Sequence, residues 1–99
     1  MIEITRDNFE SIELRGRRYQ YRGLTFSLES ELDTWSCDVW LDLPKELRDQ
    51  LHDKGVPYKW QFNAGSLPDP NYRLAVEELM DYVDGIFEHI ETSSNSADD

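Results

Sequence analysis

The clearest pattern of apolar positions lies between residues 70 and 91. Apolar side chains recur there every three or four residues, which is typical of one face of a helix. They are Tyr72, Ala75, Val76, Leu79, Met80, Val83, Ile86, Phe87 and Ile90. Asp69 is expected to cap this helix, with Pro70 in its first turn. Gly85 weakens a helix by about 1 kcal/mol relative to alanine, so we expect strong tertiary support or a close backbone approach there.

The pattern changes to strict alternation between residues 17 and 43, which is typical of strands. Tyr19 and Tyr21 share one parity, whereas Leu24, Phe26 and Leu28 share the other. The switch falls at Gly23, where a bulge or a tight turn is expected. After a polar turn, the core face of the second strand is predicted to consist of Trp35, Cys37, Val39 and Leu41.

A third strand is predicted at residues 57–62, with Tyr58, Trp60 and Phe62 on one side. A short helix is predicted at residues 44–55, because Pro44 suits a first helical turn and Gly55 suits the position after the end.

The N-terminal segment is ambiguous. Asp7 and Glu10 have the spacing of a capping box, but "IEI" and "IEL" alternate like strands, and we favour a short helix. The expected fold is α+β: a three-stranded antiparallel sheet with a long C-terminal helix on one face and one or two short helices.

Length and composition predict one domain over residues 1–91, followed by a disordered acidic tail at residues 92–99. The net charge is −11, and 12% aromatic residues argue for a folded chain. No apolar run could cross a membrane, and the N-terminus does not resemble a secretory signal. Because Cys37 has no second cysteine to pair with, we expect a cytoplasmic protein. We expect it to be either a monomer or a homodimer.

Residues that could carry chemistry are few. His52 and His89 each lack the further ligands that a metal site needs. Cys37 lies on the core parity of its strand, where an inert thiol is expected. We therefore predict no catalytic residues, no metal and no cofactor, and we do not expect an enzyme.

The segment "RGRRYQYR" is the only basic one. Its residues are Arg15, Arg17, Arg18, Tyr19, Tyr21 and Arg22. Arginine interleaved with tyrosine can hold single-stranded nucleic acid, so a small RNA-binding or ribonucleoprotein accessory module is one alternative. The order of elements is similar in outline to double-stranded RNA-binding domains, but the last helix lacks their basic start. An edge strand protected by arginines is the competing interpretation.

Trp40 lies on the opposite parity from the core, between Asp38 and Asp42. An exposed tryptophan surrounded by acids would suit a basic partner. Alternatively, the N-terminal segment covers it.

Acidic residues form a stripe along the last helix: Glu77, Asp81, Asp84, Glu88 and Glu91. Their spacing of three and four residues places like charges side by side, which costs a few tenths of a kcal/mol per pair. We interpret such a face as selected for something other than stability, such as imitation of nucleic-acid phosphates.

In size and composition the chain resembles small phage and mobile-element inhibitors, including anti-CRISPR and anti-restriction proteins, and acidic immunity proteins. This resemblance implies a non-enzymatic protein that masks a basic surface of a nucleic-acid-handling partner. The partner-binding residues would be the acidic stripe together with Trp40, Asp38 and Asp42. An assembly subunit that completes a larger complex is a further alternative. Neither a membrane nor direct nucleic-acid binding is expected.

Overall fold

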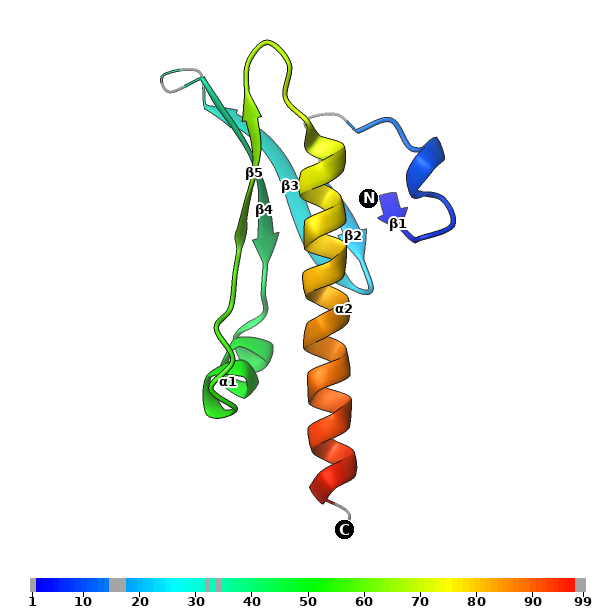
Figure 1. The fold of residues 1–99 in the computed structure, drawn as a ribbon, viewed down its shortest axis with the longest axis vertical. Coiled ribbons are helices and arrows are strands. Elements are labelled where there is room, and N and C mark those ends of the chain that lie inside the picture. The colour runs from blue at the N-terminus through cyan, green and yellow to red at the C-terminus, as the bar shows by residue number, and fades with distance from the viewer. Residues whose placement is uncertain (1, 15–17, 32, 34, 98–99) are drawn as a thin grey trace.

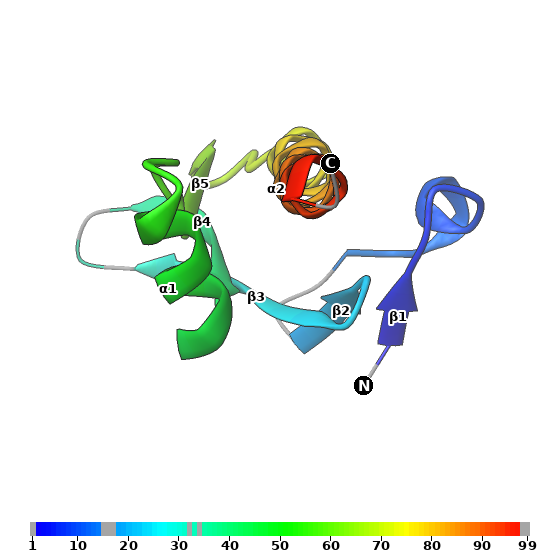
Figure 2. The ribbon, with the colours of Figure 1, turned by 90° about the horizontal axis from the view of Figure 1, so that it is seen from below.

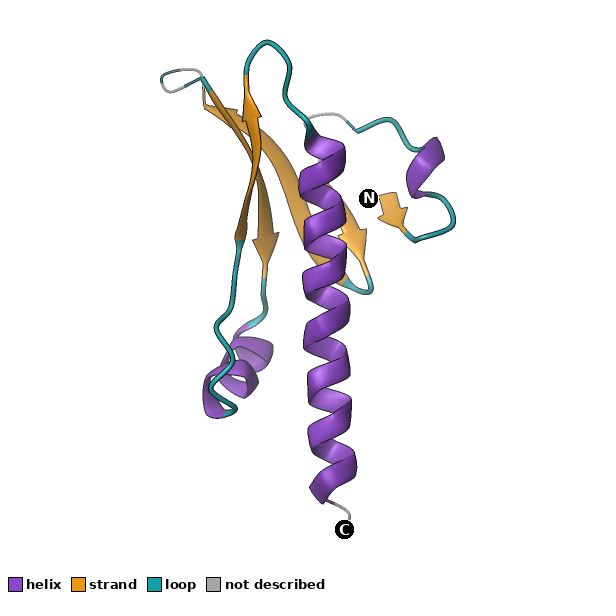
Figure 3. Ribbon diagram, in the orientation of Figure 1, coloured by secondary structure: helices purple, strands orange, loops and turns teal. Residues whose placement is uncertain are grey.

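The computed structural model describes residues 2–14, 18–31, 33 and 35–97, with only the backbone for Glu31 and residues 91–97. The elements follow in this order: β1 (Ile2–Ile4), the short 3-10 helix η1 (Phe9–Ser11), β2 (Arg18–Tyr21), β3 (Leu24–Glu31), β4 (Ser36–Asp42), α1 (Lys45–Asp53), β5 (Gln61–Ser66) and α2 (Tyr72–Ala97). The chain is α+β (Figure 3).

The sheet has five strands in the order β1-β2-β3-β4-β5 and is mixed, because β1 pairs parallel with β2 (Figure 1). The prediction of a three-stranded antiparallel sheet is therefore wrong. One predicted strand is a hairpin of two, β2 and β3, joined by Arg22 and Gly23 with φ of 52° and 83°. Two successive residues with positive φ are what a two-residue hairpin turn requires, so the parity switch at Gly23 marks a turn.

The N-terminal segment adds the other unexpected strand. Ile2 to Ile4 pair with Tyr19 to Tyr21, and helical structure follows only as the three residues of η1. The alternation of "IEI" prevails because Ile4 is fully buried when the segment is a strand.

Two further expectations about the strands are corrected. Trp35 does not belong to a core face: it precedes β4 with φ of 58° and is 62% exposed. The last strand begins at Gln61, so Tyr58 and Trp60 precede it and are exposed, and only Phe62 is buried as predicted. Regular alternation before a strand does not reveal where its pairing begins.

The helix α2 packs on one face of the sheet, against β4 and β5 (Figure 2). Its buried side chains are Ala75, Val76, Leu79, Met80, Val83 and Ile86. They meet the inward-facing residues of the strands, which include Tyr19, Phe26, Val39, Leu41 and Phe62. Fully burying each of the larger apolar side chains stabilises the fold by ~1.5–3 kcal/mol.

The start of α2 differs from the prediction. The side chain of Asn71, rather than Asp69, accepts a hydrogen bond from the N–H of Leu74 at 3.2 Å, and the helix begins at Tyr72.

The middle and the end of α2 also differ from expectation. A β-carbon at Gly85 would meet nothing within 4 Å, so no close backbone approach explains this glycine. The helix runs to Ala97, so residues 92–97 of the expected tail have helical backbone.

The opposite face of the sheet, which we call the open face, carries the polar parity of the strands. A row of paired residues crosses it from β2 to β5: Arg18, Ser27, Trp40 and Gln61. Figure 2 shows no other described element lying across this face, with α1 bordering one end. The short helix α1 is attached to the core by the buried side chains of Leu43, just before it, and Leu51 within it. Gly55 follows the end of the helix with φ of 70°.

Candidate functional site

The middle of the acidic stripe is bound from within the molecule. Arg6 Nη2 donates hydrogen bonds to Asp81 Oδ1 at 2.8 Å and to Asp84 Oδ2 at 2.7 Å. Asp84 also accepts hydrogen bonds from the Tyr21 hydroxyl at 2.8 Å and from Arg22 Nη1 at 3.0 Å. We call this group, Arg6, Tyr21, Arg22, Asp81 and Asp84, the arginine clasp. It ties the N-terminal segment and the β2–β3 turn to α2.

The electrostatics of the clasp follow from these contacts. Burial would raise the pKa of Asp84, but hydrogen bonds from Arg6, Tyr21 and Arg22 outweigh it and hold that pKa below its usual value. Burial, and next the hydrogen bond to Asp84, raises the pKa of Tyr21. Hydrogen bonds to Asp84 and Asp81 raise the pKa of Arg6. The clasp is therefore two ion-paired carboxylates and two arginines, with no net charge.

The two ends of the stripe differ from its middle. Glu77 is half-buried and Glu88 is exposed, and neither has an ion pair within the described part of the chain. The side chain of Glu91 lies outside the described residues. Because the neutral clasp separates Glu77 from Glu88, the described part of the stripe is not a continuous row of negative charge.

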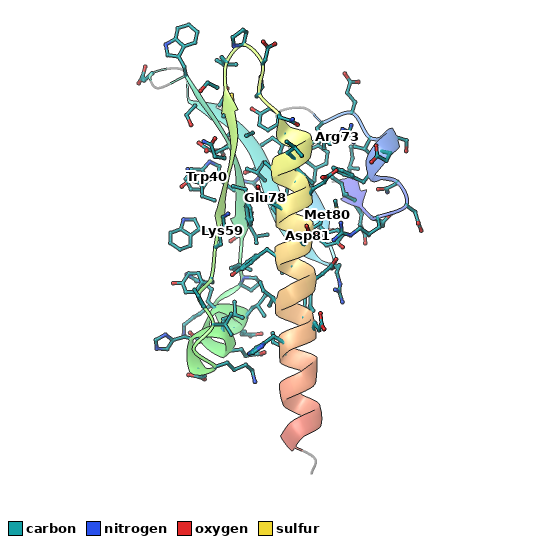
Figure 4. All side chains as sticks on the ribbon, viewed as in Figure 1. Trp40, Lys59, Arg73, Glu78, Met80 and Asp81 are labelled. Carbon is teal, nitrogen blue, oxygen red and sulfur yellow. The ribbon has the colours of Figure 1, made fainter. Side chains whose placement is uncertain are left out.

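A second contact between elements lies along α2. Lys59 Nζ is 3.8 Å from Glu78 Oε2, and the backbone N–H of Lys59 donates to the Tyr82 hydroxyl at 2.7 Å. Figure 4 shows Lys59 and Glu78 on the side of α2 that faces the strands, and Asp81 nearer the N-terminal segment. Arg73 extends toward that segment, where it donates to the carbonyl oxygens of Phe9 and Ile12.

The three predicted site residues of β4 do not behave alike. Asp38 is 3% exposed and accepts hydrogen bonds from Ser36 Oγ and Asn63 Nδ2, each at 3.1 Å. Its carboxylate is therefore buried and already hydrogen-bonded within the protein, so it is not accessible to a partner. Asp42 is exposed and has no ion pair in the described region.

Trp40 is half-buried on the open face (Figure 4). The N-terminal segment does not cover it, because β1 pairs at the far edge of the sheet and η1 lies on the α2 side. Its Nε1 is buried and has no hydrogen-bond acceptor, unlike every other buried side-chain nitrogen or oxygen in the described chain. A buried indole N–H normally finds a partner.

The described residues of the basic segment do not share one surface: the tyrosines are buried and the arginines are exposed. Tyr19 and Tyr21 are 0% and 4% exposed and lie in the core, so neither ring is free to stack on a base. Arg22 belongs to the clasp, and Arg18 is exposed on the open face. Arg15 and Arg17 lie outside the described residues.

The open face has two neighbouring hollows that the sequence analysis missed. One, of about 270 Å³, is lined by residues of β2, β3 and β4, including Arg18, Ser27, Trp40 and Asp42. The other, of about 320 Å³, lies between β4 and α1 and is lined by Leu41, Asp42, Leu43, Arg48, Tyr58 and Trp60. They share Leu41 and Asp42, and we call them together the open-face groove. The sequence pattern singles out Arg18, Trp40 and Asp42 as candidate binding residues, but it places Tyr58 and Trp60 in a strand and gives no sign that Arg48 lies near them.

Tyr58 and Trp60 are 39% and 49% exposed, and their ring centroids are 5.5 Å apart. Cys37, by contrast, is fully buried as expected. Among the described residues, no three histidine, cysteine or acidic side chains are arranged to hold a metal ion. None of the helices described is long and apolar enough to span a membrane.

Comparisons with known proteins identify no relative: no family model, no curated protein and no solved structure matches the chain.

Proposed function

We propose that this protein is a non-enzymatic binding protein that masks a basic surface of a nucleic-acid-handling partner, as an inhibitor of the anti-defence or immunity type. The observation that carries the proposal is the excess of exposed carboxylates without an ion pair in the described chain. They are Glu3, Asp7, Glu10, Glu29, Asp33, Asp42, Glu46, Asp53, Asp69 and Glu88. The lysines and arginines in the same state are Arg18, Arg48 and Lys54.

Because the acids of the clasp are paired internally, other carboxylates must supply the attraction to the partner. Asp81 and Asp84 already have cationic partners, so they are poor sites for a partner's lysines or arginines. The attraction comes instead from acids spread over several elements. Such a field accelerates association with a basic protein and weakens with salt, because exposed charges are screened beyond ~8–10 Å.

The test is a pull-down from lysate of the source cells with the tagged protein, followed by elution with salt and by competition with DNA. We expect one nucleic-acid-handling protein to be retained at low salt, released at high salt and displaced by DNA. Retention that resists salt, or a partner that DNA does not displace, contradicts the proposal.

Two matched variants locate the charge that matters. One changes Glu77 and Glu88 to lysine, and the other changes Glu46 and Asp53 to lysine on α1. Asp81 and Asp84 are left intact in both, because their loss would open the clasp. Equal slowing of association in both variants supports a distributed field, whereas slowing in the first alone identifies the ends of the stripe as the contact.

A further inference from the structure

The open-face groove contains cationic side chains that the rest of this acidic molecule leaves unpaired. Arg6 and Arg22 bind carboxylates of α2, and Arg73 binds backbone carbonyl oxygens. Arg18 and Arg48 have no such partner in the described chain, and each lines one of the two hollows. The guanidinium group is the best side-chain donor for paired hydrogen bonds to carboxylate.

Aromatic side chains line both hollows of the groove. Trp40 lines the hollow beside Arg18, and the exposed rings of Tyr58 and Trp60 line the hollow beside Arg48. Tryptophan, tyrosine and arginine are the residues that contribute most often to the binding energy of protein interfaces. Their concentration around one groove indicates a docking surface for a peptide or protein.

The charges along the groove indicate the chemistry of its occupant. The exposed Asp42 lines both hollows, with Arg18 in one and Arg48 in the other, so the order is positive, negative, positive. We propose that the groove binds an extended peptide segment of a partner that carries two carboxylates separated by an apolar or aromatic residue. One carboxylate pairs with Arg18 and the other with Arg48, while the intervening side chain lies against Trp40 and Trp60.

Single-stranded nucleic acid is the less favoured occupant. Aromatic rings and arginines also suit it, but every further nucleotide of a strand adds a negative charge that the net −11 of this chain repels. A peptide with only two carboxylates brings no more negative charge than the two arginines neutralise. This inference does not depend on the proposed function, because a groove that bound nothing would leave the negative field of the molecule intact.

The experiment measures binding of three fluorescent probes to the whole protein by anisotropy at about 0.15 M salt, where the long-range attraction of this acidic chain for a basic probe is largely screened. The probes are a peptide with two glutamates separated by one leucine and flanked by glycine and serine, the same peptide with lysine for glutamate, and a single-stranded oligonucleotide. We expect the acidic peptide to bind at least ten times more tightly than either other probe. Tighter binding of the lysine peptide or the oligonucleotide, or no detectable binding of the acidic peptide, overturns the inference.

Variants test the assigned contacts. Arg18→Gln and Arg48→Gln should each weaken the acidic peptide about tenfold, which corresponds to ~1.4 kcal/mol. Lys54→Gln is the matched control: it removes an exposed, unpaired cation outside the groove and should change affinity less than twofold. Asp42→Asn should tighten binding, because it removes the repulsive carboxylate. Equal losses in all three cation variants would mean that only net charge matters and would overturn the assigned contacts.

Discussion

The acidic stripe of α2 and the open face of the sheet differ in whether their charges are paired within the protein. The charges of the stripe are close together in the sequence, yet its middle is neutralised by Arg6 and Arg22 from distant segments. The charges of the open-face groove come from β2, β4 and α1, and none of Arg18, Asp42 and Arg48 has a partner in the described chain.

This difference reverses the interpretation of the like-charged spacing on α2. Neighbouring acids on a helix repel each other, and from the sequence alone that cost suggests an external partner. The clasp offers an internal reason: the cations that compensate Asp81 and Asp84 lie on other elements rather than four residues away. Concentrated charge in a sequence thus does not indicate an interface until the tertiary partners of each charge are known.

The largest expected effect is on the clasp. Replacing Asp84 with alanine leaves Arg6, Tyr21 and Arg22 without their shared acceptor, so the free energy of unfolding should fall by about 2 kcal/mol. Urea denaturation measures the change. Glu88→Ala on the same helix is the control and should stay within about 0.5 kcal/mol of the unmodified protein. Equal effects of the two would show that Asp84 is a solvated acid like its neighbour.

The clasp should also make stability depend on acid pH. The pKa of Asp84 is lowered in the folded protein, so its contribution is fully present above its unfolded pKa of about 3.9 and is lost as pH falls through the lower, folded value. The stability difference between the unmodified protein and Asp84→Asn should therefore be constant near pH 6–7 and shrink below about pH 4. A difference that grows on acidification would contradict the assigned sign.

Gly85 tests whether α2 depends on local helix propensity. The residue is exposed, and no atom lies near the position of an added β-carbon, so Gly85→Ala should stabilise the protein by about 1 kcal/mol. Thermal unfolding measures the gain. Destabilisation instead would reveal a constraint at this position that the packing does not show.

Trp40 should give the smallest change in stability. Its buried Nε1 has no acceptor, so Trp40→Phe removes an unsatisfied donor along with some apolar surface, and the two effects nearly cancel. We expect a change within about 0.5 kcal/mol by urea denaturation. A loss above about 2 kcal/mol would mean that the indole N–H has a partner, such as an ordered water.

Periodicity alone was a good guide where one face of an element is buried. It located α2, placed Cys37, Val39 and Leu41 in the core, and detected a switch at Gly23. It failed where strand pairing decides the structure. Tyr58 and Trp60 continue the alternation of β5 but precede the residues that pair with β4, and "IEI" joins the sheet by pairing with residues seventeen positions further along the chain.

Composition and short-range periodicity are enough to show that the chain is α+β, that it has one long amphipathic helix and that it is strongly acidic. Net charge is a sum over residues, and the apolar stripe of the helix is a pattern among residues three or four positions apart. Which charges remain without an internal partner depends on the fold. Pairing depends on distances between segments that are remote in the chain: Arg6 binds Asp84 across 78 residues, while Arg18 and Arg48 have no acidic partner among the residues that the structure describes. Because an exposed charge acts on a partner only if nothing internal has neutralised it, the binding surfaces of this protein follow from its fold rather than from its composition.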